Sequence, residues 1–336
     1  MIDNLRKLCS FSAPSGNENT VRDFILSEIS NFAECKTDNS GNIIAFKKGK
    51  KKSLKKVMVD AHMDEVGIII SGYTADGFLK FQTVGGINSS ALFCKKVLIG
   101  KDTVGVIGAR PIHLTKGEEG KKCPKTDAMY IDIGAKDKTE AENAVPLGTL
   151  GTFMDNFEII GENVKSKALD DRIGCAALIK LIKEYDDYDF YATFTVGEEL
   201  GLRGAKTAAY SLSPDYALVL EGTTASDIFG TSESEKVCIL GNGAAISFMD
   251  NSTLYDRELY NAAINSPVKS QPKAAVAGGN NSGAIHLSGA GVKTLAISAP
   301  CRYIHSGESV ANLGDICSVY DMAEYMLTGI ASGEIK

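Results

Sequence analysis

The chain has 336 residues, of which 44% are hydrophobic and 23% are charged, and its net charge is −6. This composition is typical of a soluble globular protein, and the excess of acidic over basic residues disfavours nucleic-acid binding. No stretch is long and apolar enough for a membrane span, and the N-terminus lacks the apolar core of a signal peptide. The eight cysteines are scattered without a Cys-x-x-Cys pair. We therefore expect a cytoplasmic protein with reduced thiols and no membrane or nucleic-acid partner.

The first 70 residues predict the beginning of an α/β domain. Apolar side chains recur at helical spacing across residues 1–32. Residues 56–70 form a strongly apolar run, which we interpret as a buried strand that ends around His62 and Asp64 and continues as a second apolar stretch. Ligand sites in open α/β sheets lie beyond the carboxyl ends of the strands. These two side chains are therefore candidates for a binding cleft.

The character of the sequence changes between about residues 71 and 158. Short β-type runs alternate there with Gly and Asp turns, and no long helical pattern appears. Regularly spaced short strands of this kind are typical of a small barrel or sandwich. Because α/β-type sequence lies on both sides, we predict an inserted, barrel-like β domain at 71–158. Residues 1–70 and 159–336 then form one catalytic α/β domain, with a mixed sheet and helices on both faces.

The most informative stretch of the second half joins a strand to two adjacent carboxylates. Residues 190–196 are rich in β-formers, and the chain then breaks at Gly197 onto Glu198 and Glu199. Adjacent residues of an extended chain point in different directions, so one glutamate can bind a cation while the other handles a proton. In isolation, however, a Glu-Glu pair is more often a solvated acidic turn.

Other predicted element ends in the α/β segments carry similar side chains. Together they supply two imidazoles and five carboxylates: His62, Asp64, Asp170, Glu198, Glu199, Glu221 and His305. Mixed His/Asp/Glu ligation suits zinc, cobalt or manganese, whereas the lack of cysteine argues against a purely structural zinc. A single cation would leave several carboxylates uncompensated in a cleft, which is costly. The charge count therefore favours a hydrolytic site with two divalent metal ions.

Several of these residues also have a purely structural interpretation. His62 alone could be a packed core histidine. Asp170 and Asp171 could cap the helix that follows them, or Asp171 could serve the helix or pair with Arg172 while Asp170 faces the metals. We expect the two other histidines to lie outside the site: His113 and His286.

Four motifs occur in order along the chain: AHMDEVG at 61–67, ALDDR at 168–172, EELGLRGA at 198–205 and RYIHS at 302–306. Together they resemble the M42 family of metallo-aminopeptidases, which includes glutamyl-type and tetrahedral (TET) aminopeptidases. The resemblance covers essentially the whole chain, the inserted β domain included. It implies removal of N-terminal residues from short peptides, and a large homo-oligomer, often a dodecamer, with contacts from the β domain.

The resemblance also implies a centre of two divalent metal ions per subunit, with zinc in first place and cobalt or manganese as alternatives. Asp170 would bridge the two ions. Glu199 and His305 would complete one metal site, and His62 and Glu221 the other.

Two further roles follow from the same resemblance. Glu198 would be the general base that takes a proton from a metal-bridging water. Asp64 would orient His62, since a metal-bound histidine generally gives its other N–H to a carboxylate or carbonyl.

Three positions depart from the family pattern. Many relatives have Asp where Glu221 stands, and the turn GNNSG at 279–283 lacks an acidic residue because Asn281 occurs there. The segment 241–246 lacks a proline that relatives commonly have. Since these positions are expected near the substrate, we expect them to affect specificity more than metal binding.

Three alternative functions remain open from the sequence. A related dimetal carboxypeptidase or N-acyl-amino-acid deacylase would want a cation to hold a substrate carboxylate, and Arg302 is the candidate. A metal-binding assembly protein that has lost catalysis would explain the departures at Glu221 and Asn281. A cysteine hydrolase would use Cys301 and His305, which lie four residues apart.

Overall fold

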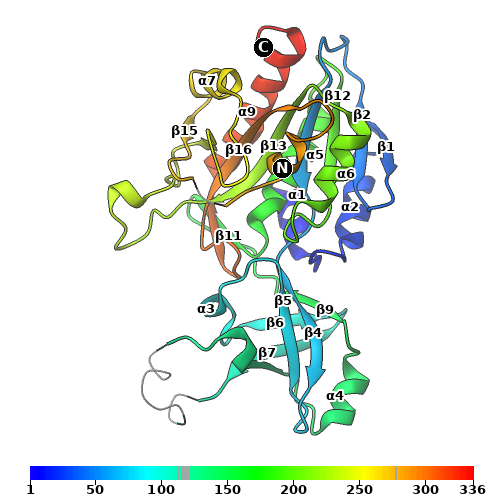
Figure 1. Ribbon diagram of the computed structural model, residues 1–336, viewed down its shortest axis with the longest axis vertical. Helices are drawn as coiled ribbons and strands as arrows, with labels where there is room; N and C mark the ends of the chain where they lie inside the picture. The colour runs from blue at the N-terminus through cyan, green and yellow to red at the C-terminus, as the bar shows by residue number, and fades with distance from the viewer. Residues whose placement is uncertain (112–113, 115–121, 277) are drawn as a thin grey trace.

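The computed structural model describes residues 1–111, 114, 122–276 and 278–336. Figure 1 shows a larger domain built around a wide sheet and, below it, a smaller β domain. Both chain termini lie on the larger domain, so the smaller one is an insertion. This architecture confirms the predicted fold class. Among the described residues, no helix is both long and apolar enough to cross a membrane.

The larger domain contains an 11-stranded mixed sheet. Its strands are β1 (Glu34–Thr37), β2 (Ile43–Lys47), β3 (Val57–His62), β10 (Glu158–Ile160), β11 (Asn163–Ser166), β12 (Phe190–Thr195), β13 (Tyr216–Thr224), β14 (Ala244–Ile246), β15 (Ser270–Pro272), β16 (Lys293–Arg302) and β17 (Ser309–Asn312). The strand order is β1-β2-β12-β3-β13-β16-β17-β11-β10, and β14 pairs with β15 and β16.

The centre of this sheet is parallel. Strands β12, β3, β13 and β16 pair in parallel, so their carboxyl ends meet at one edge. All six residues of β3 are buried, as expected for a parallel strand covered on both faces. This edge is where a ligand site is expected in an open α/β sheet.

Helices cover both faces of the sheet, as predicted. One face packs against α1 (Ile2–Ser10), α2 (Asn19–Ile29), α5 (Leu169–Glu184) and α9 (Leu313–Ser332), and the other against α6 (Arg203–Leu212) and α8 (Ser282–Ile285). Successive side chains of β3 point to opposite faces of the sheet. Val57 and Val59 pack in the hydrophobic core on the side of α1, α2, α5 and α9, whereas Met58 packs in the core on the side of α6 and α8.

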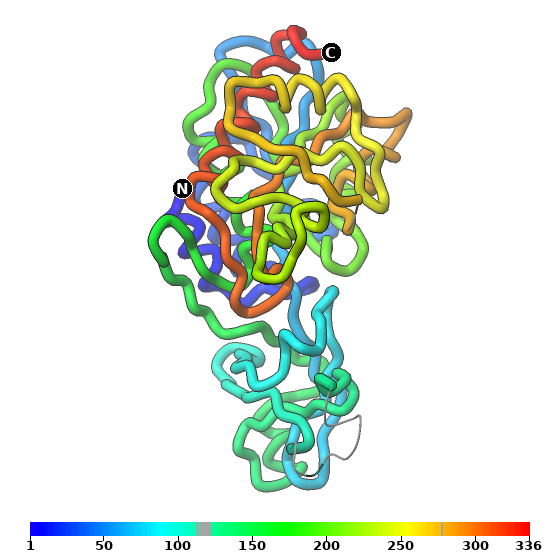
Figure 2. Tube along the Cα trace, turned by 90° about the vertical axis from the view of Figure 1, so that its left-hand side faces the viewer, coloured from blue at the N-terminus to red at the C-terminus, as the bar shows by residue number. Residues whose placement is uncertain are grey.

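The inserted domain is a closed six-stranded barrel with the order β4-β5-β8-β7-β6-β9. Its strands are β4 (Gly67–Tyr73), β5 (Leu79–Val84), β6 (Lys96–Ile99), β7 (Thr103–Ala109), β8 (Met129–Asp132) and β9 (Leu150–Phe153), with short helices α3 (Ser89–Leu92) and α4 (Lys138–Ala144). The barrel has a hydrophobic core of its own. Figure 2 shows it set apart from the rest of the chain.

The chain enters the barrel between His62 and Gly67, slightly before the predicted boundary at residue 70. The apolar run 56–70 therefore forms two strands in two different sheets, with only β3 in the larger domain. Glycine is needed where the second strand begins, because a Cβ atom on Gly67 would lie 2.6 Å from the Gly151 carbonyl oxygen and 2.7 Å from the Pro14 Cβ. Burial on both sides made the two strands look continuous in the sequence.

Candidate metal centre

The carboxyl ends of the central strands bring polar side chains together. Strand β3 ends on His62, β13 carries Glu221, and the turn after β12 carries Glu198 and Glu199. Gly197 starts that turn with φ of +63°, a conformation that glycine adopts without a steric penalty. The start of α5 and the turn after β16 supply the remaining two expected ligands: Asp170 and His305.

The carboxylate of Asp170 lies between the two imidazoles. Its Oδ1 atom is 3.3 Å from Nε2 of His62, and its Oδ2 atom is 3.3 Å from Nε2 of His305. Glu221 Oε2 lies 3.7 Å from the same His62 nitrogen, and Glu199 Oε1 lies 3.4 Å from the same His305 nitrogen. The five residues expected as ligands thus form two adjoining groups that share Asp170.

Asp64 holds the neighbouring residues in place from beneath. His62 Nδ1 lies 3.0 Å from the Asp64 carbonyl oxygen and 3.4 Å from its Oδ1 atom. The Asp64 carboxylate also accepts the backbone N–H groups of Glu198 and Glu199, at 3.0 and 3.1 Å, and the Ser15 hydroxyl at 2.6 Å. It therefore fixes both the imidazole and the Glu-Glu turn. The contacts to the turn could not be predicted from spacing, because they join distant parts of the chain.

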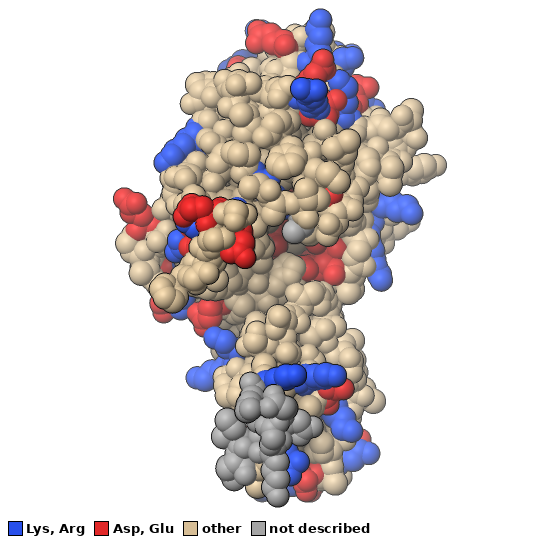
Figure 3. All heavy atoms as spheres, turned by 60° about the vertical axis from the view of Figure 1, so that its left-hand side comes forward, with Lys and Arg blue, Asp and Glu red and all other residues tan. Residues whose placement is uncertain are grey.

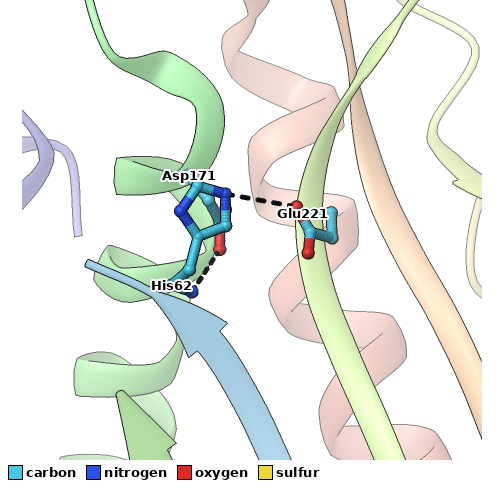
Figure 4. A group of neighbouring side chains, drawn as sticks. All are labelled: His62, Asp171 and Glu221. Carbon is cyan, nitrogen blue, oxygen red and sulfur yellow. Dashed lines mark hydrogen bonds and ion pairs between the residues drawn. The ribbon is translucent and has the colours of Figure 1, made fainter. Parts of the chain in front are cut away.

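Asp171 offers a second possible ligand set, since ligand atoms of His62, Asp171 and Glu221 all lie within 4.8 Å of one another. Figure 4 shows the Asp171 carboxylate against the main chain of His62, whose ring faces Glu221. Asp171 Oδ2 accepts the His62 N–H at 3.1 Å, and Oδ1 accepts the Gly174 N–H at 2.7 Å. Both oxygens thus bind backbone groups near the start of α5, which leaves Asp170 better placed to face the cations.

A buried ionic cluster behind the centre was not predicted. Lys167 Nζ donates to the two carboxylate oxygens of Glu65, at 2.7 and 2.8 Å, and to the Phe11 carbonyl at 2.6 Å. Arg172 donates to Glu65 at 3.1 Å, as does the Ala13 N–H. Arg172 therefore pairs with Glu65, in contrast to the pairing with Asp171 that the sequence also allowed.

The pKa values of the clustered side chains indicate that positive charge would stabilise this site. Burial and the neighbouring carboxylates raise the pKa of Glu198 to about 8 and that of Glu199 to about 7. Burial also acts to raise the pKa of Asp170, but its contacts with His305 and His62 outweigh burial and hold that pKa below its usual range. Burial acts against the protonated form of His305, but Asp170 and Glu199 raise its pKa to about 9.

The residues present fit a pair of divalent cations. Glu221 Oε1 is buried and has no hydrogen-bond partner among the described residues, which a cation would supply. The donors are imidazole nitrogens and carboxylate oxygens, a set that suits zinc, cobalt or manganese. Many relatives have Asp at position 221, and the longer Glu side chain of this protein also reaches the centre. Glu221 is therefore compatible with metal ligation.

A pocket of about 330 Å³ opens beside the centre, with Asp170, Glu198, Glu221 and His305 in its wall. Its further lining includes Thr223, Thr224, Val237, Lys273 and Asn280. Figure 3 shows acidic side chains near the middle of one face of the larger domain, above the junction with the barrel. Lys273 is a polar residue of this pocket that sequence patterns did not single out.

The departure at Asn281 lies beneath this pocket and does not line it. Asn281 is fully buried, and its amide donates to Asp60 Oδ2 at 2.7 Å and to Thr195 Oγ1 at 2.8 Å. In the segment 241–246, Gly241 and Gly243 donate backbone N–H groups to Asp315, both at 2.7 Å. Asn281 therefore supports the floor of the site by hydrogen bonding, and its expected effect on specificity stays a prediction.

The structure weakens two alternatives. Arg302 Nε and NH2 each lie 2.7 Å from an oxygen of Asp227, so its guanidinium is already held by a carboxylate. Cys301 is fully buried, and burial raises the pKa of its thiol well above the usual value, which disfavours a thiolate nucleophile.

His286 lies at the end of α8, where its Nδ1 contacts the Ser282 carbonyl at 2.7 Å, and His113 lies outside the described residues.

Solved structures of aminopeptidases share this fold. The aminopeptidase APDkam598 from the archaeon Desulfurococcus kamchatkensis has a TM-score of 0.91 at 34% identity, with 96% of this chain and 93% of that chain covered. The TET1 peptidase of Pyrococcus horikoshii, described as assembling into a tetrahedron or a large octahedral shell, has a TM-score of 0.83 at 32% identity, with 97% and 98% covered. The fold and the site define an enzyme of the aminopeptidase class.

Sequence relatives narrow this class to a family. A protein of Acetivibrio thermocellus with a provisional aminopeptidase name is 40% identical, with 94% of this chain and 95% of the relative covered. The glutamyl aminopeptidase of Lactococcus lactis is 30% identical (100% and 98% covered), and the lysyl aminopeptidase of Pyrococcus furiosus is 29% identical (96% and 95% covered). The sequence profile of M42 glutamyl aminopeptidases matches residues 41–322. The chain belongs to this M42 family.

Proposed function

We propose that this protein is a metal-dependent aminopeptidase that removes N-terminal residues from short peptides. The observation that carries the proposal is the position of Asp170, whose two carboxylate oxygens each lie 3.3 Å from a different imidazole. A carboxylate placed in this way can bridge two cations, and the open pocket beside it can admit a peptide end.

The ligand sets follow from the two groups of side chains. His62 and Glu221 would hold one ion, Glu199 and His305 the other, and Asp170 would contact both. Bound divalent cations, with zinc in first place and cobalt or manganese as alternatives, would acidify a water molecule and polarise the scissile carbonyl.

Glu198 is the proposed general base. Its Oε2 atom lies 4.0 Å from Nε2 of His62, and the side chain lines the pocket. Nearby cations favour the ionised form of a carboxyl group, so metal binding would bring its pKa down from the raised value. The Glu198 carboxylate then takes the proton of the attacking water and delivers it to the leaving amine.

The same side chains favour an aminopeptidase over a deacylase or carboxypeptidase. A free N-terminal ammonium suits a cleft lined by carboxylates, whereas an acylated terminus has no positive charge to offer. A substrate carboxylate would need a cation, and Arg302 is bound to Asp227 by two hydrogen bonds. A protein without catalysis would have no need of Glu198 beside the ligands.

The test uses protein stripped of metal by a chelator and reloaded with zinc, cobalt or manganese. We expect metal-dependent cleavage of peptides with free N-termini and none of the acetylated peptides. Glu198→Gln should keep the metal content and lose at least about 100-fold in kcat. The matched control Glu142→Gln, on the exposed helix α4, should behave as wild type. Cleavage of the acetylated series, or full activity of Glu198→Gln, would overturn the proposal.

We further propose that the chain assembles with copies of itself in the cytoplasm. Edge strand β10 exposes Ile159 and Ile160, which are 49% and 55% accessible, and such an edge is a candidate contact surface. One solved TET1 structure holds a dodecamer, which is the assembly size we propose to test. Light scattering that gives a monomer would contradict it.

A further inference from the structure

Four consecutive backbone N–H groups directly after β12 each donate to a side-chain oxygen, and this run includes the proposed base. The donors are Val196, Gly197, Glu198 and Glu199, and the acceptors in the same order are Asn42, Glu18 and, for the last two, Asp64. All four distances are 3.0 or 3.1 Å. Glu18 is thus a second buried carboxylate, besides Asp64, that holds the turn which presents Glu198.

A tight turn near the N-terminus directs Glu18 toward this site. Asn17 N–H donates to the Pro14 carbonyl at 2.9 Å, and Gly16 between them has φ of +91°, which glycine adopts without a steric penalty. Glu18 then occupies the N-cap position of α2, but its side chain makes no capping hydrogen bond to that helix, which the structure describes completely. Its Oε1 atom instead accepts the N–H of Gly16 at 2.9 Å and that of Gly197 at 3.1 Å. The carboxylate therefore connects the N-terminal turn to the turn after β12.

Gly197 is the point at which the turn after β12 has the most conformational freedom. A glycine adopts positive and negative φ about equally well, so its N–H can turn away unless an acceptor holds it. A hydrogen bond from this N–H to a carboxylate favours one orientation by about 10- to 100-fold. The fixed orientation of this peptide group sets the direction in which the next residue, Glu198, leaves the strand.

We infer that Glu18 is a positioning residue for the general base Glu198 and acts through the Gly197 N–H. The inference rests on the aminopeptidase mechanism proposed above. A base must lie within hydrogen-bond reach of the proton that it takes, and a displacement of about 1 Å can cost about 100-fold in rate. Because Asp64 separately holds the Glu199 N–H and His62, loss of the Glu18 contact should displace the base more than the metal ligands.

The test separates the reach of the Glu18 side chain from its charge. Glu18→Gln keeps an accepting oxygen at the same distance from the main chain and removes the charge, whereas Glu18→Asp keeps the charge and shortens the side chain by one methylene group. We expect Glu18→Asp to lower kcat by about 10- to 100-fold, with KM and metal content within a few-fold of the wild type. Glu18→Gln should retain kcat within a few-fold.

A control variant on the same helix measures the effect of general destabilisation. Glu28 lies on α2 and pairs with Lys183 of α5, away from the turn after β12. Glu28→Met removes this ion pair and should leave kcat and KM at their wild-type values. A loss of kcat in Glu28→Met equal to that in Glu18→Asp would show that any weakening of α2 suffices, and it would overturn the specific role of Glu18.

A double-mutant cycle shows whether Glu18 acts through the base. If it does, Glu18→Asp should lower kcat strongly in the wild type but only slightly in the Glu198→Gln background, where no base remains to be positioned. Additive losses in the double variant would overturn the inference. So would wild-type kcat in Glu18→Asp, or a loss in Glu18→Gln that exceeds the loss in Glu18→Asp.

A measurement without substrate keeps this inference distinct from the proposed function. Amide hydrogen exchange of metal-loaded protein, read by mass spectrometry on fragments that cover residues 196–199, should be faster in Glu18→Asp than in the wild type and unchanged in Glu18→Gln. Unchanged exchange in Glu18→Asp would show that Glu18 does not hold the turn. Failure of the wild type to cleave any free-amine peptide would overturn the aminopeptidase function, and the exchange rates would still decide whether Glu18 fixes Gly197.

Discussion

The ammonium of Lys167 lies 2.7 and 2.8 Å from the two carboxylate oxygens of Glu65, and each residue is only 1% exposed. Glu65 lies on the segment that enters the barrel, three residues after His62, and Lys167 lies between β11 and α5 of the larger domain, three residues before Asp170. The ion pair therefore ties the segment that enters the barrel to the start of α5 in the larger domain. Each member of the pair thus lies three residues from a proposed metal ligand, His62 or Asp170.

We predict that Lys167→Met lowers the free energy of unfolding by about 3–5 kcal/mol, because it leaves a buried carboxylate only partly compensated. Arg172 and the Ala13 N–H would remain as partners of Glu65, at 3.1 Å each. Thermal and chemical unfolding of metal-loaded protein measure the effect. Lys138→Met, which breaks an exposed ion pair with Glu142, should cost less than about 1 kcal/mol.

A double-mutant cycle separates the ion pair from general packing. If the loss in Lys167→Met comes from the uncompensated charge, adding Glu65→Gln should recover part of it. Strictly additive losses in the double variant would show that the two side chains do not act as a pair.

A second prediction concerns Asp64, which accepts hydrogen bonds through both carboxylate oxygens. Glu198 N–H contacts Oδ1 at 3.0 Å, and Glu199 N–H contacts Oδ2 at 3.1 Å. Asp64→Asn replaces one oxygen by an NH2 group that must face a donor, so the Glu-Glu turn and His62 lose their fixed positions. We expect metal affinity and kcat/KM to fall by about 10- to 100-fold.

Metal titration and steady-state kinetics on the same preparation measure both effects of Asp64→Asn. Ser15→Ala, which removes only the hydroxyl that donates to Asp64, should give a smaller loss in each. Wild-type metal affinity in Asp64→Asn would show that the carboxylate does not position the ligands.

Much of the fold could be predicted because its signals are local. Apolar runs bounded by glycine indicated strands such as the one that reaches Glu198, and turn-rich sequence indicated the inserted barrel. The candidate site followed from the same logic, since carboxylates and imidazoles at the ends of parallel strands meet at one edge of a sheet.

What could not be predicted depends on contacts between distant parts of the chain. The Glu65–Lys167 pair joins residues 102 positions apart, and the contact of Asn281 with Asp60 spans 221 positions. Neither pair has a spacing that marks it in the sequence. The predicted domain boundary at residue 70 was wrong for a related reason, since the barrel begins at Gly67. A buried strand has the same apolar sequence pattern whether it belongs to the sheet or to the barrel.

The last prediction uses the buried contact between Asn281 and Asp60. Burial raises the pKa of Asp60 to about 6, although Thr193 and Asn281 donate to its carboxylate at 2.5 and 2.7 Å. Asn281→Asp would replace the donating amide by a second carboxylate, so at least one of the two must bind a proton in the folded state. The folded protein then binds more protons than the unfolded chain, and stability falls as the pH rises above the unfolded pKa near 4. We expect the melting temperature of Asn281→Asp to approach that of the wild type near pH 5 and to fall progressively below it toward pH 8, where the destabilisation is about 3 kcal/mol.

Asn281→Ala removes the amide without adding a charge. Its loss of melting temperature relative to the wild type should therefore vary less with pH when all three proteins are compared at equal metal loading. A deficit in Asn281→Asp that stays constant from pH 5 to pH 8 would show that no shared proton is needed beneath the metal centre.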